Sequence, residues 1–342
     1  MPRFDELVGQ QRPVRVLAGI LAKREIPHAF LFTGIDGVGK RTAAMLFAMA
    51  LNCLTHAEGD GPVHEPCGEC RSCRAVISGA HPFVTLVEPG GGVIKIDRIR
   101  EIVRRISFRP PGAGTRVIII ADAHRMNPEA ANALLKSLEE PPPQTIFFLT
   151  AENVSDLLPT VVSRCSHVRF NPVPPEAVET FIRDRYQLDK ENARLVAAMS
   201  EGSIAKALDI AGTPGELDRL ARMRRRLCEE LYAMPSHRLS AVLAFAERMY
   251  KNKDHIDRWL YMILSFLKDA MVVCAGGGKN IANTDVRETV LNIARRESVQ
   301  SLAAKIDAVL ETERAILRNL NLRLSLELMA LRLADRCDEK NS

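Results

Sequence analysis

The stretch GIDGVGKRT, from Gly34 to Thr42, constrains this chain more than any other part of its sequence. An apolar run over 29–33 precedes it and another over 43–50 follows, so we expect a strand, a glycine-rich turn and a helix. Glycine lets a backbone approach an anion closely, and a helix N-terminus directs unpaired N–H groups toward it. Lys40 can neutralise phosphate oxygens. The stretch therefore predicts a phosphate-binding loop, with glycines at three positions: Gly34, Gly37 and Gly39.

One position departs from the phosphate-loop pattern. The pattern places Ser or Thr directly after the lysine, where the hydroxyl ligates Mg²⁺, and this chain has Arg41 instead. Thr42 cannot simply substitute, because one step along a helix turns a side chain by about 100°. We therefore expect a loop that holds phosphate but holds the metal ion poorly. The alternative is that Lys40 is an ordinary lysine at the start of a helix.

Composition narrows the class of protein only modestly. The chain has 342 residues, enough for two or three domains, and its net charge of +5 permits contact with nucleic acid without requiring it. No signal peptide is indicated, and no stretch approaches the length of a membrane span. We therefore expect a cytoplasmic protein with no membrane partner, in which the eight cysteines stay reduced.

Four of the cysteines suggest a metal site. Cys53 stands alone, and Cys67, Cys70 and Cys73 follow in a C-x2-C-x2-C pattern. Thiolates at this spacing can close a tetrahedral Cys₄ zinc site, and a site with four protein ligands has no open position for chemistry, so we expect it to be structural. A loop of free thiols and an iron–sulfur site are the alternatives. Two histidines are substitute ligands, His56 and His64.

Strands and helices alternate through the first half of the chain. A continuous apolar run over 116–121 is typical of a buried parallel strand, and Asn127 followed by Pro128 begins a helix. Prolines over 172–175 indicate a domain boundary that includes 168–170. The other expected strands cover 84–87, 93–96 and 145–150, and the other expected helices of this half cover 13–23, 98–107 and 157–162.

The second half is expected to be almost entirely helical. Leucines alternate over 320–333 as in a strand, but Leu, Glu, Ala and Met are helix formers and β-branched residues are absent, so we expect a helix. One of these helices carries a cluster of four arginines. By default we expect these arginines to form a solvated face or a subunit contact. They are Arg222, Arg224, Arg225 and Arg226.

Four motifs occur in one order: the phosphate loop, the cysteine pattern, NALLKSLEEPP over 132–142, and Ser-Arg-Cys over 163–165. Together they resemble the clamp-loader subunits of bacterial DNA polymerase III, over essentially the whole chain and most strongly in its first half. The resemblance implies a RecA-like AAA+ domain, with a parallel sheet and a zinc module, over 1–166. It further implies a small helical lid over 167–211 and an all-α collar over 212–342. Members of this family load the sliding clamp onto primed DNA.

The resemblance also separates two types of subunit. Aligned from 134–136, the metal-binding Asp of the ATP-hydrolysing gamma/tau type falls on Ala121, and the lid arginine falls on Ala205. Because Arg41 also replaces a metal ligand, the resemblance implies the delta-prime type, with weak binding of ATP or ADP and no Mg²⁺-dependent hydrolysis. An active gamma/tau-type ATPase is the alternative. The residues expected at this degenerate site are Gly34, Gly37, Gly39, Lys40, Thr42 and Asp122.

Arg164 is the residue that we expect to carry function. The resemblance implies an arginine finger that reaches the γ-phosphate of ATP on a neighbouring gamma/tau subunit. The alternative is a surface arginine in an ordinary salt bridge. The implied partners are gamma/tau and delta subunits in a hetero-pentamer of the DNA-directed DNA polymerase III holoenzyme, with the clamp and DNA reached through the complex. A stand-alone, zinc-stabilised nucleic-acid-binding protein is a third hypothesis, which the absence of a concentrated basic stripe does not favour.

Overall fold

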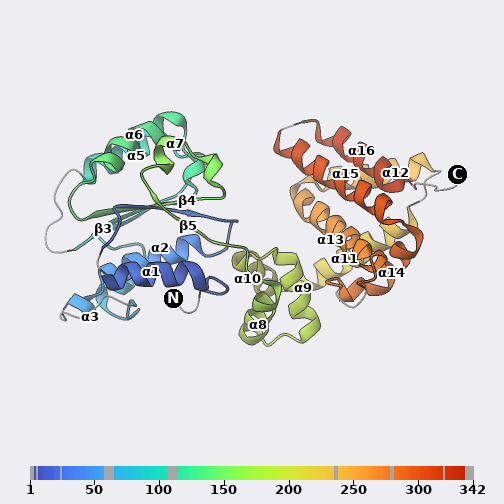
Figure 1. Ribbon diagram of the computed structural model, residues 1–342, viewed down its shortest axis with the longest axis horizontal. Coiled ribbons are helices and arrows are strands. Elements are labelled where there is room, and N and C mark those ends of the chain that lie inside the picture. The colour runs from blue at the N-terminus through green and yellow to red at the C-terminus, as the bar shows by residue number, and fades with distance from the viewer. Residues whose placement is uncertain are drawn as a thin grey trace. The chain divides into compact units, whose positions relative to one another are not determined.

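The computed structural model describes residues 4, 7–23, 25–57, 65–106, 114–234, 238–277, 281–318 and 320–335. The chain divides into two compact units, which are described separately below (Figure 1). The first comprises Met1–Phe181 with Glu201–Lys206, and the second comprises Ile182–Ser200 with Ala207–Ser342. The division into three domains, at 166 and 211, stays a prediction.

A five-stranded sheet forms the centre of the first unit, with all neighbouring strands parallel and the order β2-β3-β4-β1-β5. Both β1 and β4 are buried along their whole length, which explains their continuous apolar sequences. Leu31 of β1 lies opposite Leu149 of β4 and His167 of β5. The strands are β1 (Ala29–Thr33), β2 (Val84–Val87), β3 (Arg116–Ile120), β4 (Thr145–Ala151) and β5 (Ser166–Arg169).

Helices cover both faces of this sheet: α1 and α2 lie on one face, and α5, α6 and α7 lie on the other (Figure 1). The helices are α1 (Gln11–Lys23), α2 (Lys40–Leu51), α3 (Leu54–Ala57), α4 (Arg71–Ile77), α5 (Ile96–Ile106), α6 (Pro128–Glu139) and α7 (Pro159–Val162). Two 3₁₀ turns, η2 (Ala123–Arg125) and η3 (Val154–Asp156), follow β3 and β4. The parallel α/β architecture that the sequence predicts is therefore confirmed.

Alternation along β1 supplies side chains to two separate cores. Successive residues of a strand point to opposite faces, so Phe30 packs toward α2, where its ring lies 5.5 Å from that of Phe47 and 4.8 Å from that of Phe148. Leu31 points the other way, into a buried cluster that includes Ile99 of α5 and Leu134 of α6. These two cores hold the loop after β1 in a fixed position.

One local prediction in this unit was wrong, and one strand was not predicted. The segment 93–96 is not a strand, because it forms only isolated bridges from Val93 to Gly90 and from Ile94 to Met126, and α5 begins already at Ile96. The strand that was not predicted is β5, whose last two residues lie in the segment assigned to a domain boundary. Among the four residues of β5 only Val168 is buried, so the strand carries no apolar run. By contrast, the Asn127 cap is confirmed, since its side chain accepts a hydrogen bond from the Ala130 N–H at 3.0 Å.

The second unit is helical, as predicted. It contains α9 (Lys190–Ser200), α11 (Glu216–Ala233), α12 (Leu239–Lys251), α13 (Ile256–Cys274), α14 (Arg287–Arg296), α15 (Val299–Leu317) and α16 (Leu322–Ala334), with 3₁₀ turns η4 (Lys253–His255) and η5 (Thr284–Val286). Residues of α8 (Pro175–Tyr186) and α10 (Ile204–Gly212) are shared between the two units. Within the described ranges, no helix combines the length and the apolar character needed to cross a membrane.

Two apolar sides explain the leucine pattern of α16. One side packs on α12 and α15 and buries Leu326, Met329 and Leu333. The other side leaves Leu324 and Leu328 more than half exposed. The alternation over 320–333 therefore does not reflect a strand, and the helix predicted there is confirmed. We call the exposed side the leucine face; its residues are Leu320, Leu324, Leu328 and Leu331.

Arg224 corrects the expectation for the arginine cluster, because its side chain is buried with 1% exposure. Its Nε and Nη2 donate to the two carboxylate oxygens of Asp285 at 3.1 and 3.0 Å, and Nη2 also donates to Asn283 Oδ1 at 2.6 Å. Asn283 in turn donates its backbone and side-chain N–H groups to Asp269, both at 2.7 Å. This network joins α11, α13 and η5. The other three arginines of the cluster are exposed, as expected.

Replacing Arg224 should destabilise the second unit. In Arg224→Met the carboxylate of Asp285 and the amide of Asn283 lose their buried donor, and removing one partner of such a pair costs about 3 kcal/mol or more. Urea unfolding followed by circular dichroism measures this loss. Arg225→Met, on the exposed side of the same helix, is the control and should change the unfolding free energy by less than about 0.5 kcal/mol. Equal stability of the two variants would contradict the role given to this network.

Candidate functional site

The predicted phosphate loop connects β1 to α2. Gly34, Gly37 and Gly39 have φ values of 146°, 71° and 107°, which L side chains rarely adopt. A Cβ atom on Gly34 would lie 2.3 Å from the carbonyl oxygen of Phe170. Packing within the protein therefore requires glycine at position 34, whether or not an anion is bound.

Lys40 is buried at the start of α2, with 6% exposure. Its Nζ donates to the carbonyl oxygens of Gly34 at 2.6 Å and Ile35 at 2.8 Å. Burial lowers the pKa of Lys40, and the nearby carboxylates of Asp36, Asp122 and Glu152 oppose that shift. The loop's own carbonyl groups thus hold the ammonium group of Lys40, and a phosphate must compete with them for its N–H groups. The nearby carboxylates also repel a phosphate.

Arg41 turns outward from the loop. Its side chain is about half exposed and its Nη1 forms an ion pair with Glu88, which directly follows β2. Thr42, the next residue, is half-buried on α2. The position required for a metal-ligating hydroxyl therefore carries a paired cation.

The end of β3 supplies Asp122 but no carboxylate before it. Ala121 is buried, and Asp122 is half-buried with a left-handed backbone conformation, φ 49°. The Asp122 N–H donates to Thr150 Oγ1 of β4 at 3.0 Å, which fixes this residue between the two strands.

Ser203, which directly precedes α10, and Ala205, in its first turn, contact the phosphate loop. The Ala205 N–H donates to the Gly37 carbonyl oxygen at 3.1 Å. A Cβ atom on Gly37 would lie 2.3 Å from Ser203 Oγ and 2.6 Å from Ala205 Cβ. Glycine at position 37 is therefore required by this contact. Ser203 is a residue of this site that the sequence motifs gave no reason to select.

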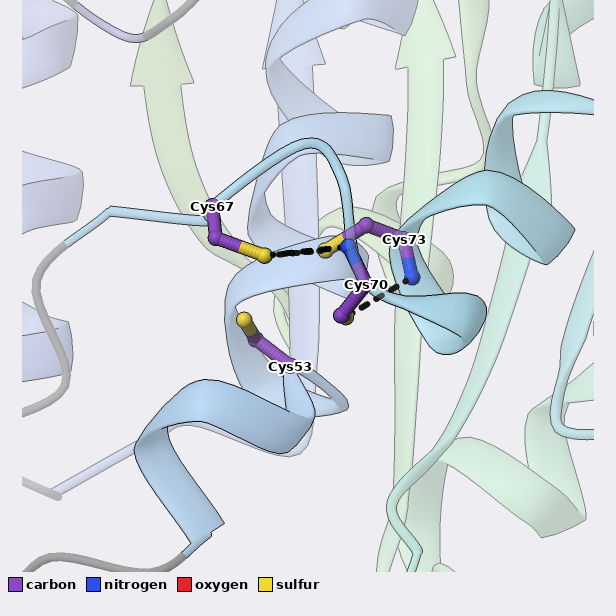
Figure 2. A group of neighbouring side chains, drawn as sticks. All are labelled: Cys53, Cys67, Cys70 and Cys73. Atoms are coloured by element: carbon purple, nitrogen blue, oxygen red, sulfur yellow. Dashed lines mark hydrogen bonds between the residues drawn. The ribbon is translucent and has the colours of Figure 1, made fainter.

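The structure brings together the four predicted cysteine ligands, Cys53, Cys67, Cys70 and Cys73 (Figure 2). Their sulfur atoms all lie within 4.8 Å of one another, and the Cys67 and Cys73 sulfurs are 3.9 Å apart. A tetrahedral ion with metal–sulfur bonds of about 2.3 Å needs sulfurs about 3.8 Å apart. The cluster can therefore hold a metal ion. His64 and the side chain of His56, the substitute ligands, lie outside the described residues.

Backbone N–H groups also point at the sulfurs. The Cys70 N–H donates to Cys67 Sγ at 3.3 Å, and the Cys73 N–H donates to Cys70 Sγ at 3.4 Å. Hydrogen bonds of this kind favour the thiolate. The pKa of Cys67 is lowered to about 6, chiefly by a hydrogen bond from the Thr55 side chain and then by the Cys70 N–H. Burial raises the pKa of Cys73. Binding of a cation would compensate the cost of ionising this buried thiol.

One histidine anchors the cysteine module to the sheet. Nδ1 of His81 accepts a hydrogen bond from the Phe83 N–H at 3.2 Å, so Nε2 carries the proton and donates to Ser72 Oγ at 3.0 Å. Burial lowers the pKa of His81, consistent with the neutral ring that these bonds need. His81 thereby links α4, which contains Cys73, to the segment that begins β2. His81 lies outside the cysteine pattern, so the sequence did not indicate this role.

Arg164 follows α7 and lies at the surface, with 33% of its side chain exposed. Its Nη2 donates to Glu139 Oε1 at 2.5 Å, and its Nη1 donates to the Thr160 carbonyl oxygen at 2.8 Å and to Ser163 Oγ at 3.3 Å. Cys165 packs against the core, and burial raises its pKa to about 12, as expected for an unreactive thiol.

Comparison with known proteins gives matches along most of the chain. The family model described as DNA polymerase III, delta subunit, matches residues 9–174, and that described as DNA polymerase III, delta subunit, C terminal, matches residues 219–335. The DNA polymerase III subunit delta' of Bacillus subtilis is 31% identical over 326 residues, which cover 95% of this chain and 96% of that protein.

Relatives of the tau and gamma type match a smaller part. The DNA polymerase III subunit tau of Bacillus subtilis is 32% identical over 61% of this chain, and this chain spans 37% of that longer protein. Among solved structures, a DNA polymerase III gamma subunit-related protein from Thermotoga maritima is 21% identical, with a TM-score of 0.44 over 94% of this chain and 99% of that one. The end-to-end match to delta' and the two family models decide the assignment. This chain belongs to the delta' family of DNA polymerase III clamp-loader subunits.

Proposed function

We propose that this chain is a non-hydrolysing subunit of its clamp loader, and that it supplies an arginine finger to an ATP site on a neighbouring subunit. The observation that carries this proposal is the side chain at position 41. An arginine paired with Glu88 stands where an active site needs a hydroxyl for Mg²⁺. Without the ion, charge that develops between the β- and γ-phosphates loses its main neutralising partner.

Three further features support a degenerate nucleotide site. Ala121 cannot ligate a metal at the end of β3, and Ala205 cannot contact phosphate at the start of α10. The ammonium group of Lys40 is already bonded to two carbonyl groups. The remaining N–H groups of the loop still allow weak binding of ATP or ADP. The groups available for that weak binding are the loop residues Gly34, Gly37, Gly39, Lys40 and Thr42, with Asp122 close by.

The partly exposed side chain of Arg164 supports the finger role. Arginine stays ionised at all relevant pH values, and its planar fork matches the oxygens of a phosphate group. Arg164 follows the short helix α7, and two apolar side chains in the chain before that helix are exposed, Val154 and Leu158. An arginine and exposed apolar side chains in the same stretch of chain are typical of a surface that a partner covers. The partner proposed here is a gamma/tau subunit with bound ATP.

The leucine face of α16 supports assembly with other subunits. Three large apolar side chains follow one side of this helix and Leu320 precedes it, and Leu239 and Leu243 of the neighbouring α12 are exposed as well. A contiguous apolar face of this kind marks a protein–protein interface. We assign it to the contact with gamma/tau and delta subunits in a hetero-pentamer that loads the sliding clamp onto primed DNA in the cytoplasm. Undiminished complex formation by Leu324→Glu would contradict this assignment.

The cysteine cluster is proposed to hold a structural zinc ion. Four thiolates and no open position fit zinc in a structural role. The chain as purified should contain about one zinc ion, and Cys67→Ser combined with Cys70→Ser should lose it and lower the melting temperature of the first unit. Metal analysis and thermal unfolding measure the two effects. Cys274→Ser, in the second unit, is the control. Full zinc occupancy in the double variant would show that the ligands are other residues.

Removing the finger should slow hydrolysis at the neighbouring site. We expect Arg164→Ala to fold and assemble normally with gamma/tau and delta subunits, and to reduce single-turnover ATP hydrolysis at that site about a thousandfold. Arg169→Ala, which removes another exposed arginine on β5, should leave the rate unchanged. Wild-type hydrolysis by the Arg164 variant would refute the finger, and robust hydrolysis by the isolated chain would favour the active gamma/tau type instead.

A further inference from the structure

The geometry points to Glu139 as a positioning residue for Arg164. This inference rests on the proposed finger role and adds that the finger is held in place by its own chain before any partner binds. Glu139 belongs to the LEEPP segment and does not itself reach the neighbouring subunit's ATP in this proposal. It acts only through the guanidinium of Arg164, which its carboxylate contacts at 2.5 Å.

Three hydrogen bonds fix the guanidinium of Arg164. Glu139 Oε1, the Thr160 carbonyl oxygen and Ser163 Oγ accept three bonds from Nη1 and Nη2 of Arg164. Within the described part of the chain, these bonds leave at least two of the five N–H groups of Arg164 without an acceptor. A phosphate needs two parallel N–H groups for a bidentate contact. The three acceptors therefore hold one part of the guanidinium, and its remaining N–H groups stay available to a phosphate.

The position of Glu139 in its helix also favours the ion pair. It is the last residue of α6, at the negative end of the helix dipole, where a carboxylate is unfavourable unless a cation lies close by. Prolines at 141–143 follow and fix the chain direction there. Because α7 packs against α6, Arg164, which follows α7, lies close enough to Glu139 to supply this cation (Figure 1).

The ion pair also lowers the entropy cost of ordering the Arg164 side chain. A free arginine side chain has many rotamers, and ordering it at the moment of hydrolysis lowers the rate. An ion pair that already selects one rotamer removes part of this cost. Since Arg164 and Glu139 are 33% and 48% exposed, solvent weakens their attraction and the effect is modest. We expect Glu139→Ala to slow hydrolysis at the neighbouring site about fivefold, far less than the loss of Arg164 itself.

The test uses the assembled clamp loader in single-turnover ATP hydrolysis, with ATP affinity measured separately. Glu139→Ala should lower the rate at the neighbouring site and leave ATP affinity unchanged, while Glu139→Gln, which keeps an oxygen acceptor, should restore most of the rate. Glu140→Ala is the matched control, because Glu140 is the adjacent exposed carboxylate and forms no ion pair among the described residues. In the Arg164→Ala background, Glu139→Ala should cause no further loss.

The outcomes separate the two proposals. A large loss in Arg164→Ala with a wild-type rate in Glu139→Ala would overturn the positioning role and keep the finger. No loss in Arg164→Ala would overturn the finger and this inference together. A faster rate in Glu139→Ala would mean that the carboxylate restrains the arginine, which also contradicts a positioning role. Equal melting curves and equal complex formation for every variant show that the differences arise at the site.

Discussion

The ion pair between Arg41 and Glu88 bears directly on whether the nucleotide site of the first unit can bind Mg²⁺. It places a guanidinium at the start of α2, where this type of loop normally presents a metal-ligating hydroxyl. Mg²⁺ neutralises the phosphate charges and orients the γ-phosphate, so the loss of its ligand affects hydrolysis more than it affects the fold. The buried sheet and the turn after β1 remain intact around this change.

The glycine-rich loop has a second use that does not depend on nucleotide. A side chain at position 34 would collide with the carbonyl of Phe170, and one at position 37 would collide with Ser203. The loop is thus a packing element that Phe170, after β5, and the start of α10 both contact. A chain that does not hydrolyse ATP still needs these glycines. A phosphate-loop sequence pattern alone therefore cannot distinguish an active site from a scaffold.

Local patterns in the sequence predicted most of the first unit, and long-range partners explain what they missed. Some features depend only on residues that lie close together in the sequence, so they could be predicted from it directly. These are the apolar runs of β1, β3 and β4, the Asn127 cap and the cysteine spacing. In contrast, β5 buries only Val168 and offers no apolar run. Arg224 is buried because Asn283 and Asp285, 59 and 61 residues away, accept its hydrogen bonds. Glu139 pairs with Arg164 across 25 residues, and no spacing rule connects them.

The proposed function requires that this chain's own phosphate loop does not use Mg²⁺. Calorimetric titration of the isolated chain with ATP, with and without Mg²⁺, tests it most directly, and Arg41→Thr provides the comparison because it restores the missing hydroxyl. We predict weak binding that Mg²⁺ does not strengthen in the natural chain. Tight, Mg²⁺-dependent binding by the natural chain would contradict the account.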